Sequence, residues 1–141
     1  MKIVLDSNIF ISSFYWAGNP RKVFDRVTNG LDELFITREV INEIASVMAR
    51  EKFITKIDEI NEYIKIIKNY SINIMSKNDP KDISRDKGDN KILQCGVDGN
   101  VEFIITGDDD LLVLKEYNKI KIVNPAEYLK IVETFSSSKE R

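Results

Sequence analysis

Two short apolar runs in this chain each lead within three residues to an acidic residue, and this pattern limits the folds open to it. Ile3-Val4-Leu5 is followed by Asp6, and Phe103-Ile104-Ile105 is followed by Thr106-Gly107-Asp108. Continuous apolar runs of this length are typical of strands buried on both faces of a parallel sheet. Parallel strands present their carboxyl ends at one edge of the sheet, which is where sites form in such folds. We therefore expect both acidic clusters at the same edge.

The segments between these runs predict helices that alternate with further strands. About five strands are expected, over residues 3–5, 34–36, 72–74, 101–106 and 120–123. Apolar residues at helical spacing, together with turn and capping residues, predict helices over 9–16, 23–27, 40–48, 57–67, 89–97 and from Pro125 onward. The polar stretch 77–88 is expected to be a loop. This alternation predicts a single α/β domain over 1–132 with a mostly parallel sheet, and residues 133–141 are expected to form a disordered tail.

The absence of histidine restricts the chemistry available to the chain. Its 141 residues include no His and one Cys, Cys95, so His-based triads, His-ligated zinc, internal disulfides and multi-cysteine metal sites are excluded. The net charge of −2 also excludes a polycation that coats nucleic acid. There is no signal-peptide apolar region and no apolar run long enough to span a membrane, so we expect a cytoplasmic protein without a membrane partner.

Four acids are the first candidates for a site, and each has a simpler alternative. Asp6 and Asp108 follow strands, Asp89 begins a helix, and Glu43 lies on the helix after the second strand. A carboxylate cluster without His or Cys suits the hard cations Mg²⁺ and Mn²⁺, which prefer oxygen ligands. On the other hand, Asp6 could simply cap the following helix, Glu43 could be a solvated helix acid, and the run 108–110 could be an unpartnered acidic turn. We interpret the nearby Glu39 as a surface residue and prefer Asp89 to Asp86, because Asp89 directly precedes the helix.

Four segments of the chain together resemble PIN-domain ribonucleases, and most of all the toxins of prokaryotic type II toxin–antitoxin pairs. The resemblance covers residues 1–132. It is carried, in the family's order, by Val4-Leu5-Asp6-Ser7-Asn8-Ile9-Phe10-Ile11-Ser12, Val40-Ile41-Asn42-Glu43-Ile44, Ser84-Arg85-Asp86-Lys87-Gly88-Asp89-Asn90-Lys91-Ile92-Leu93 and Thr106-Gly107-Asp108-Asp109-Asp110-Leu111-Leu112. The segment 122–129 is also similar. Gln94-Cys95-Gly96-Val97 departs from the alanine-rich helix usual in the family, which concerns packing more than chemistry.

The resemblance implies a three-layer α/β/α fold and assigns roles to individual residues. Asp6, Glu43, Asp89 and Asp108 would form the catalytic acidic core that binds Mg²⁺ or Mn²⁺, and Asp110 would be a further metal-binding acid. Ser7 and Asn8 would be polar neighbours of Asp6, and Thr106 would steady the loop that carries Asp108.

The implied function is that of a metal-dependent endoribonuclease acting on single-stranded RNA, with a cognate antitoxin protein as partner and a homodimer as the assembly. Two alternatives remain open. The first is a PIN fold that binds RNA or protein without catalysis, although the intact acids argue against it. The second is a phosphotransfer protein that uses Asp6 as the phosphate acceptor, although the second Asp that such proteins place two residues later is here Asn8.

Overall fold

The structure, a computed structural model, describes residues 1–50, 54–75 and 87–139. In the last of these segments it describes the side chains of residues 90–135. Helices and strands alternate along the described residues, in agreement with the sequence. In chain order they are β1 (Lys2–Leu5), α1 (Ser7–Tyr15), α2 (Asn19–Thr28), β2 (Glu33–Ile36), α3 (Arg38–Met48), α4 (Ile57–Asn69), β3 (Ser71–Asn73), α5 (Lys87–Asp98), β4 (Phe103–Ile105), α6 (Asp109–Leu112), β5 (Glu116–Tyr117), β6 (Ile120–Val123) and α7 (Pro125–Lys139).

The strands of the described chain form one six-stranded sheet in the order β3-β2-β1-β4-β6-β5. Neighbouring strands are parallel except β5 and β6, which are antiparallel. In the central pair, β1 and β4, Ile3 lies opposite Phe103 and Leu5 lies opposite Ile105. The chain runs outward from β1 to β2 and β3, and the other half of the sheet begins at β4. The strand order therefore reverses between β1 and β4, and in open parallel sheets this reversal point is where binding sites form.

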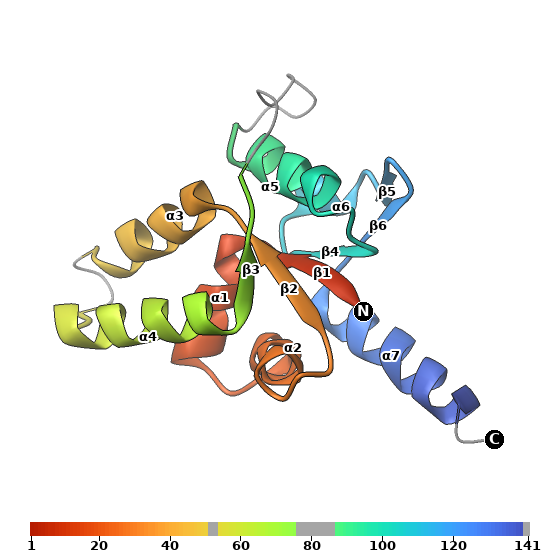
Figure 1. The fold of residues 1–141 in the computed structure, drawn as a ribbon, viewed down its shortest axis with the longest axis horizontal. Coiled ribbons are helices and arrows are strands. Elements are labelled where there is room, and N and C mark those ends of the chain that lie inside the picture. Colours follow the sequence, from red (N-terminus) through yellow and green to blue (C-terminus); the bar gives the residue numbers. More distant parts are fainter. Residues whose placement is uncertain (51–53, 76–86, 140–141) are drawn as a thin grey trace.

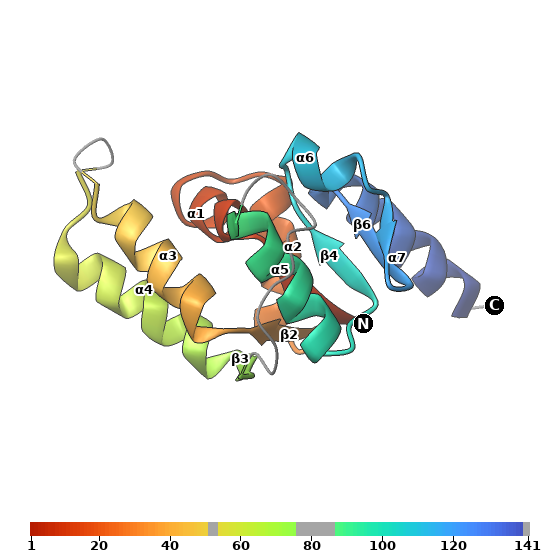
Figure 2. The same cartoon turned by 90° about the horizontal axis from the view of Figure 1, so that it is seen from above.

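Helices cover both faces of the sheet and confirm the expected α/β arrangement (Figures 1 and 2). On one face α7 packs against β4, where the rings of Phe103 and Tyr128 meet edge to face at 5.3 Å. On the other face α5 comes so close to β4 that a Cβ added at Gly96 would lie 2.8 Å from Cδ1 of Ile104. This close approach gives a physical reason for glycine at position 96.

Helices α3 and α4 lie side by side and extend beyond α1 (Figures 1 and 2). A buried group of hydroxyls joins α4 to α1. The Tyr63 hydroxyl donates to the carbonyl oxygen of Phe10 at 2.7 Å and lies 2.6 Å from Oγ of Ser13. Burial raises the pKa of Tyr63 to about 12, so this hydroxyl keeps its proton at neutral pH. These contacts hold the pair α3–α4 against the end of the molecule where β1 finishes.

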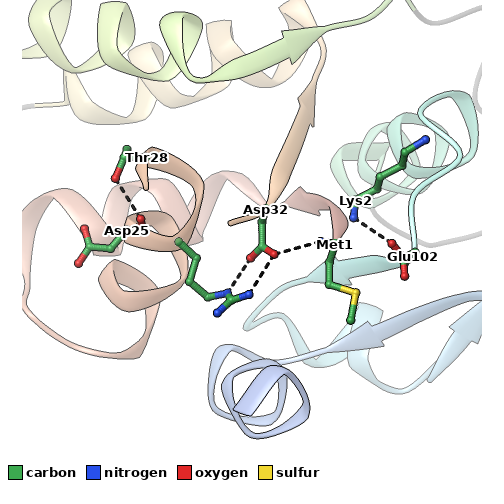
Figure 3. Close-up of polar contacts among 7 residues, drawn as sticks. Met1, Lys2, Asp25, Thr28, Asp32 and Glu102 are labelled. Carbon is green, nitrogen blue, oxygen red and sulfur yellow. Dashed lines mark hydrogen bonds and ion pairs between the residues drawn. The ribbon is translucent and has the colours of Figure 1, made fainter. Parts of the chain in front are cut away.

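A buried carboxylate organises the opposite edge of the sheet, where the strands begin (Figure 3). Asp32 accepts hydrogen bonds from Nε and Nη2 of Arg26 at 2.9 and 3.3 Å, and its Oδ1 lies 3.3 Å from the ammonium group of Met1. Burial and the nearby Asp32 raise the pKa of Tyr128. This cluster brings together α2, α7 and the residues that directly precede β1 and β2, at the end of the molecule away from Asp6.

The structure differs from the sequence-based expectation in three elements. Helix α6 and the short strand β5 lie in a region where the sequence predicted neither. Helix α7 continues to Lys139, past residue 132, where we expected a disordered tail to follow. Extending an existing helix costs much less than starting one, and serine is only moderately unfavourable within it, so the run Ser136-Ser137-Ser138 does not end α7.

No helix in the described ranges is long and apolar enough to cross a membrane.

Candidate active site

Asp6 follows β1 at the point where the strand order reverses, and it is 7% exposed. Its backbone N–H donates to the carbonyl oxygen of Ile105 at 3.0 Å, which ties the end of β1 to the end of β4. Asp6 occupies the N-cap position of α1, but its side chain accepts no capping hydrogen bond. Helix capping alone therefore does not account for an acid at this position.

Thr106 connects the Asp6 carboxylate to the loop after β4. Its Oγ1 donates to Oδ2 of Asp6 at 2.7 Å and accepts a hydrogen bond from the backbone N–H of Asp108 at 3.0 Å. The backbone of Thr106 is held in turn, because its N–H donates to the carbonyl oxygen of Val123 at 3.0 Å. Ser7 Oγ lies 3.4 Å from Oδ1 of Asp6 and donates to it. Both Ser7 and Thr106, which we predicted to lie near the acidic core, thus contact Asp6.

The surroundings of Asp6 disfavour its negative charge. Burial raises the pKa of Asp6 above its ordinary value, and the charges of Glu43 and Asp108 raise it further. The hydrogen bonds from Thr106 and from the backbone N–H of Ser7 oppose this change, because they stabilise the charged form. Three of the acids predicted from the sequence are therefore close enough to interact electrostatically, and a bound cation would relieve their repulsion.

Helix α3 carries Glu43 toward Asp6 and leaves Glu39 in solvent. The helix begins directly after β2, with Oγ1 of Thr37 accepting a hydrogen bond from the backbone N–H of Val40 at 3.4 Å. Ile44 is fully buried beside Glu43, which is half-buried, whereas Glu39 in the first turn is exposed. This placement agrees with the choice of Glu43 over Glu39 as the site acid.

The acidic run after β4 has a defined structure. The half-buried Asp108 caps α6, because its Oδ1 accepts from the backbone N–H of Asp110 at 3.0 Å. Asp109 and Asp110 are exposed in the first turn of α6. The backbone of Asp108 is therefore tied to Asp6 through Thr106, while Asp110, which we predicted as an additional metal ligand, is exposed two residues further along the chain, in the first turn of α6.

The fourth predicted acid, Asp89, belongs to the first turn of α5, but its side chain lies outside the described residues, as does all of Asp86. Among the side chains that are described, no three His, Cys, Asp or Glu residues converge closely enough to hold a metal ion. The described side chains around Asp6, which are those of Ser7, Glu43, Thr106 and Asp108, offer a metal ion oxygen ligands only, and these are the ligands that Mg²⁺ and Mn²⁺ prefer. A complete metal site thus requires a contribution from Asp89, from movement of Glu43 or Asp108, or from water.

A cleft of about 790 Å³ opens beside Asp108, between the starts of α1, α2, α6 and α7. Two Asn-Pro pairs that are far apart in the sequence, Asn19-Pro20 and Asn124-Pro125, both line it. The remaining lining residues are Asn8, Ile9, Ser12, Gly107, Asp108, Asp109, Asp110 and Ala126. In the sequence, Gly18-Asn19-Pro20 indicated a turn between two helices, and Pro125 indicated the first turn of the last helix. The repeat of the Asn-Pro pair marks residues that line the cleft, but it does not predict that they meet there.

A second, shallower pocket of about 470 Å³ lies between α1 and α4. Phe14, Tyr63 and Ile66 supply its apolar surface, and three acids of α4 surround it, Asp58, Glu59 and Glu62. Apolar surface with a rim of one charge sign is a feature of surfaces that bind a partner of opposite charge.

The comparisons with known proteins agree with the geometry. A family model described as the PIN domain matches residues 2–110. The uncharacterized protein MJ1680 of Methanocaldococcus jannaschii is 28% identical over 148 aligned positions, which cover 97% of this chain and 95% of that protein. Among solved structures, that of VapBC2 from Rickettsia felis bound to a DNA fragment from its promoter matches with a TM-score of 0.64 and 14% identity, over 88% of this chain and 98% of that one. This structural likeness shows a shared fold, and the family match, which spans most of the sequence, shows that the chain belongs to the PIN domain family.

Proposed function

We propose that this protein is a metal-dependent endoribonuclease that hydrolyses phosphodiester bonds of single-stranded RNA. The observation that carries the proposal is the environment of Asp6. Its carboxylate is buried where the strand order reverses, is held by Thr106, and is destabilised by the charges of Glu43 and Asp108. An acid in this position gains most from a bound cation. PIN domains are generally nucleases, which agrees with this assignment.

Four acids would hold Mg²⁺ or Mn²⁺, directly or through water, and these are Asp6, Glu43, Asp89 and Asp108. Asp110 would be an additional acid at the same site. When bound, such an ion lowers the pKa of a water molecule and stabilises the charge that develops on the phosphate. Thr106 and Ser7 keep the Asp6 carboxylate in one orientation by donating hydrogen bonds to its two oxygens. The bond from Asp108 N–H to Thr106 ties the loop after β4 to the same hydroxyl that holds Asp6.

The geometry favours this function over the two alternatives. A phosphate acceptor must present a carboxylate oxygen to its donor, whereas Asp6 is buried and its Oδ2 accepts from Thr106. A binding module without catalysis has no need for two acids whose charges disfavour the charge of the buried Asp6 carboxylate.

Cleavage of RNA with and without metal tests the proposal. Purified protein should cleave single-stranded RNA in Mg²⁺ or Mn²⁺, stop in excess EDTA, and recover when Mn²⁺ is restored. Cleavage that continues undiminished in EDTA would refute the metal-dependent mechanism. RNA binding without any cleavage under all of these conditions would favour the binding module instead.

We further propose that the protein is a cytoplasmic toxin controlled by an antitoxin. The R. felis structure with the same fold is that of VapBC2 bound to promoter DNA, which supports a comparable pairing here. The pocket between α1 and α4 offers apolar surface surrounded by Asp58, Glu59 and Glu62, and this suits a basic amphipathic segment. An arginine of that segment would also satisfy the acids around Asp6 and oppose metal binding.

Growth and co-purification test this pairing. Expression of the wild-type chain alone should slow growth, and expression of Asp6→Asn should not. The product of a small open reading frame overlapping upstream should co-purify with the protein. Glu62→Lys should weaken this association, while Glu133→Lys, on an exposed position of α7 outside the pocket, should not. Equal binding by both variants would place the partner elsewhere.

A homodimer completes the proposal, and light scattering of the purified chain tests it directly. A mass near that of two 16.3 kDa chains is expected, and a monomer at micromolar concentration would contradict it.

A further inference from the structure

We infer that the cleft beside Asp108 binds an unpaired base of the RNA, next to the bond that is cut, and so gives the enzyme a sequence preference. The inference rests on the proposed nuclease function. It concerns the cleft between the starts of α1, α2, α6 and α7, whose volume of about 790 Å³ lies within the usual range for small-molecule sites. Asp108 belongs both to this cleft and to the surroundings of Asp6, so a group bound in the cleft is adjacent to the reacting phosphate.

The chemistry of the lining suits a base and opposes a phosphate. Within the described residues, the cleft wall contains no lysine or arginine, and it carries the acids of the run 108–110. A phosphate group placed there away from a bound metal ion would meet repulsion from these acids, with no basic side chain in the described lining to compensate it. The remaining polar groups are neutral, and they are the amides of Asn8, Asn19 and Asn124 and the hydroxyl of Ser12.

Neutral amides between apolar surfaces are well suited to unpaired bases. An asparagine amide offers a donor and an acceptor side by side and can form two hydrogen bonds with one base edge. Proteins that read single-stranded RNA combine such contacts with flat surfaces on which the base rests. Here the rings of Pro20 and Pro125, each directly after an asparagine of the cleft, provide apolar surface beside the amides.

One of these amides is already held in place. Oδ1 of Asn124 accepts a hydrogen bond from the backbone N–H of Glu127 at 2.8 Å, which fixes the side chain at the start of α7. Because this bond uses only the oxygen of the Asn124 amide, the two N–H groups of that amide can donate to a base in the cleft. Asn19, in contrast, is an exposed residue of the first turn of α2, and Gly18 rather than Asn19 occupies the N-cap position of that helix.

Cleavage of matched oligonucleotides tests the inference. The substrates are single-stranded RNAs that differ at one nucleotide beside the cut bond, with all four bases and an abasic residue. Wild-type protein should cleave its favoured base at least about fivefold faster than the least favoured, as expected when one amide discriminates between base edges. Asn19→Ala and Asn124→Ser, which keeps a capping oxygen, should reduce this preference by lowering the rate for the favoured base toward the rate for the abasic substrate. The matched variant Asn61→Ala, on an exposed position of α4, should behave as wild type.

Two results would overturn the inference. One is equal wild-type rates for all four bases and the abasic substrate. The other is that the cleft variants slow the abasic substrate as much as the rest, which would show that the cleft holds the RNA backbone.

Binding of the same RNAs to Asp6→Asn separates this inference from the proposed function. A base preference in binding that Asn19→Ala removes, without cleavage by wild-type protein, would support the cleft and refute the nuclease. Cleavage without any base preference in rate or binding would support the nuclease and refute the base-binding cleft.

Discussion

Thr106 and Asp6 share a hydrogen bond of 2.7 Å that joins the ends of the two central strands, β4 and β1. Because the same hydroxyl accepts from the backbone N–H of Asp108, one buried side chain sets the relation between two acids that are about a hundred residues apart. Each acid follows the end of its strand, and Thr106 links the carboxylate of Asp6 to the backbone of Asp108.

Replacing Thr106 tests this role. Thr106→Val keeps the shape of the side chain but removes both hydrogen bonds, whereas Thr106→Ser keeps the hydroxyl. We expect Mn²⁺ affinity to fall about 10- to 100-fold in Thr106→Val, as is typical when the group that orients a metal ligand is lost. Titration calorimetry with Mn²⁺ measures this change, and Thr106→Ser should stay near wild type. Equal affinity in the valine variant would show that Thr106 serves the fold alone.

The raised pKa of Asp6 predicts how stability depends on pH. Because the pKa of Asp6 is higher in the folded than in the unfolded chain, the folded chain holds the carboxyl proton more tightly than the unfolded chain does. The free energy of unfolding therefore falls as pH rises from about 4 through the raised pKa of Asp6. In EDTA, Asp6→Asn should therefore melt a few degrees above wild type at neutral pH, and this advantage should shrink toward acidic pH.

Metal should reverse this order. Mn²⁺ at about a hundredfold excess over its Kd would stabilise the wild-type fold by about 2.7 kcal/mol and should have little effect on Asp6→Asn. Thermal unfolding of both proteins with and without Mn²⁺ measures the difference. A wild-type melting temperature that Mn²⁺ leaves unchanged would mean that the acids do not form one site.

The cluster at the opposite edge of the sheet should affect stability without affecting chemistry. Asp32→Asn leaves Arg26 without its buried counter-charge, and we expect the free energy of unfolding to fall by about 2 kcal/mol. Asp25→Asn, an exposed change on helix α2, which also carries Arg26, should cost less than about 0.5 kcal/mol. Urea unfolding measures both. RNA cleavage by folded Asp32→Asn should match wild type, and a selective loss of activity would contradict a purely structural role.

The sequence predicted the parallel strands well because each is a short apolar run with a clear end. The strand β5 escaped prediction for an identifiable reason. It pairs with β6 across a tight turn in which Asn118 and Lys119 have positive φ angles of 49° and 67°. Such turns are usually recognised by glycine, and lysine at the second position conceals the hairpin.

The site was predictable in part for a similar reason. Acids directly after strands can be placed from the strand order alone, which is how Asp6 and Asp108 were found. The link through Thr106 and the meeting of Asn19 with Asn124 in one cleft depend on tertiary packing between β4, α2 and α7, and no local pattern specifies it.

The most direct test of the account is the rate of RNA cleavage in Mn²⁺ by single acid-to-amide variants and their matched neighbours. Asp6→Asn and Asp89→Asn should each lower the rate by orders of magnitude while folding normally, because each removes a proposed metal ligand. Asp86→Asn and Glu39→Gln should cleave at close to the wild-type rate. The proposed metal site is contradicted if Asp6→Asn remains fully active, or if Asp86→Asn is inactive while Asp89→Asn cleaves RNA normally.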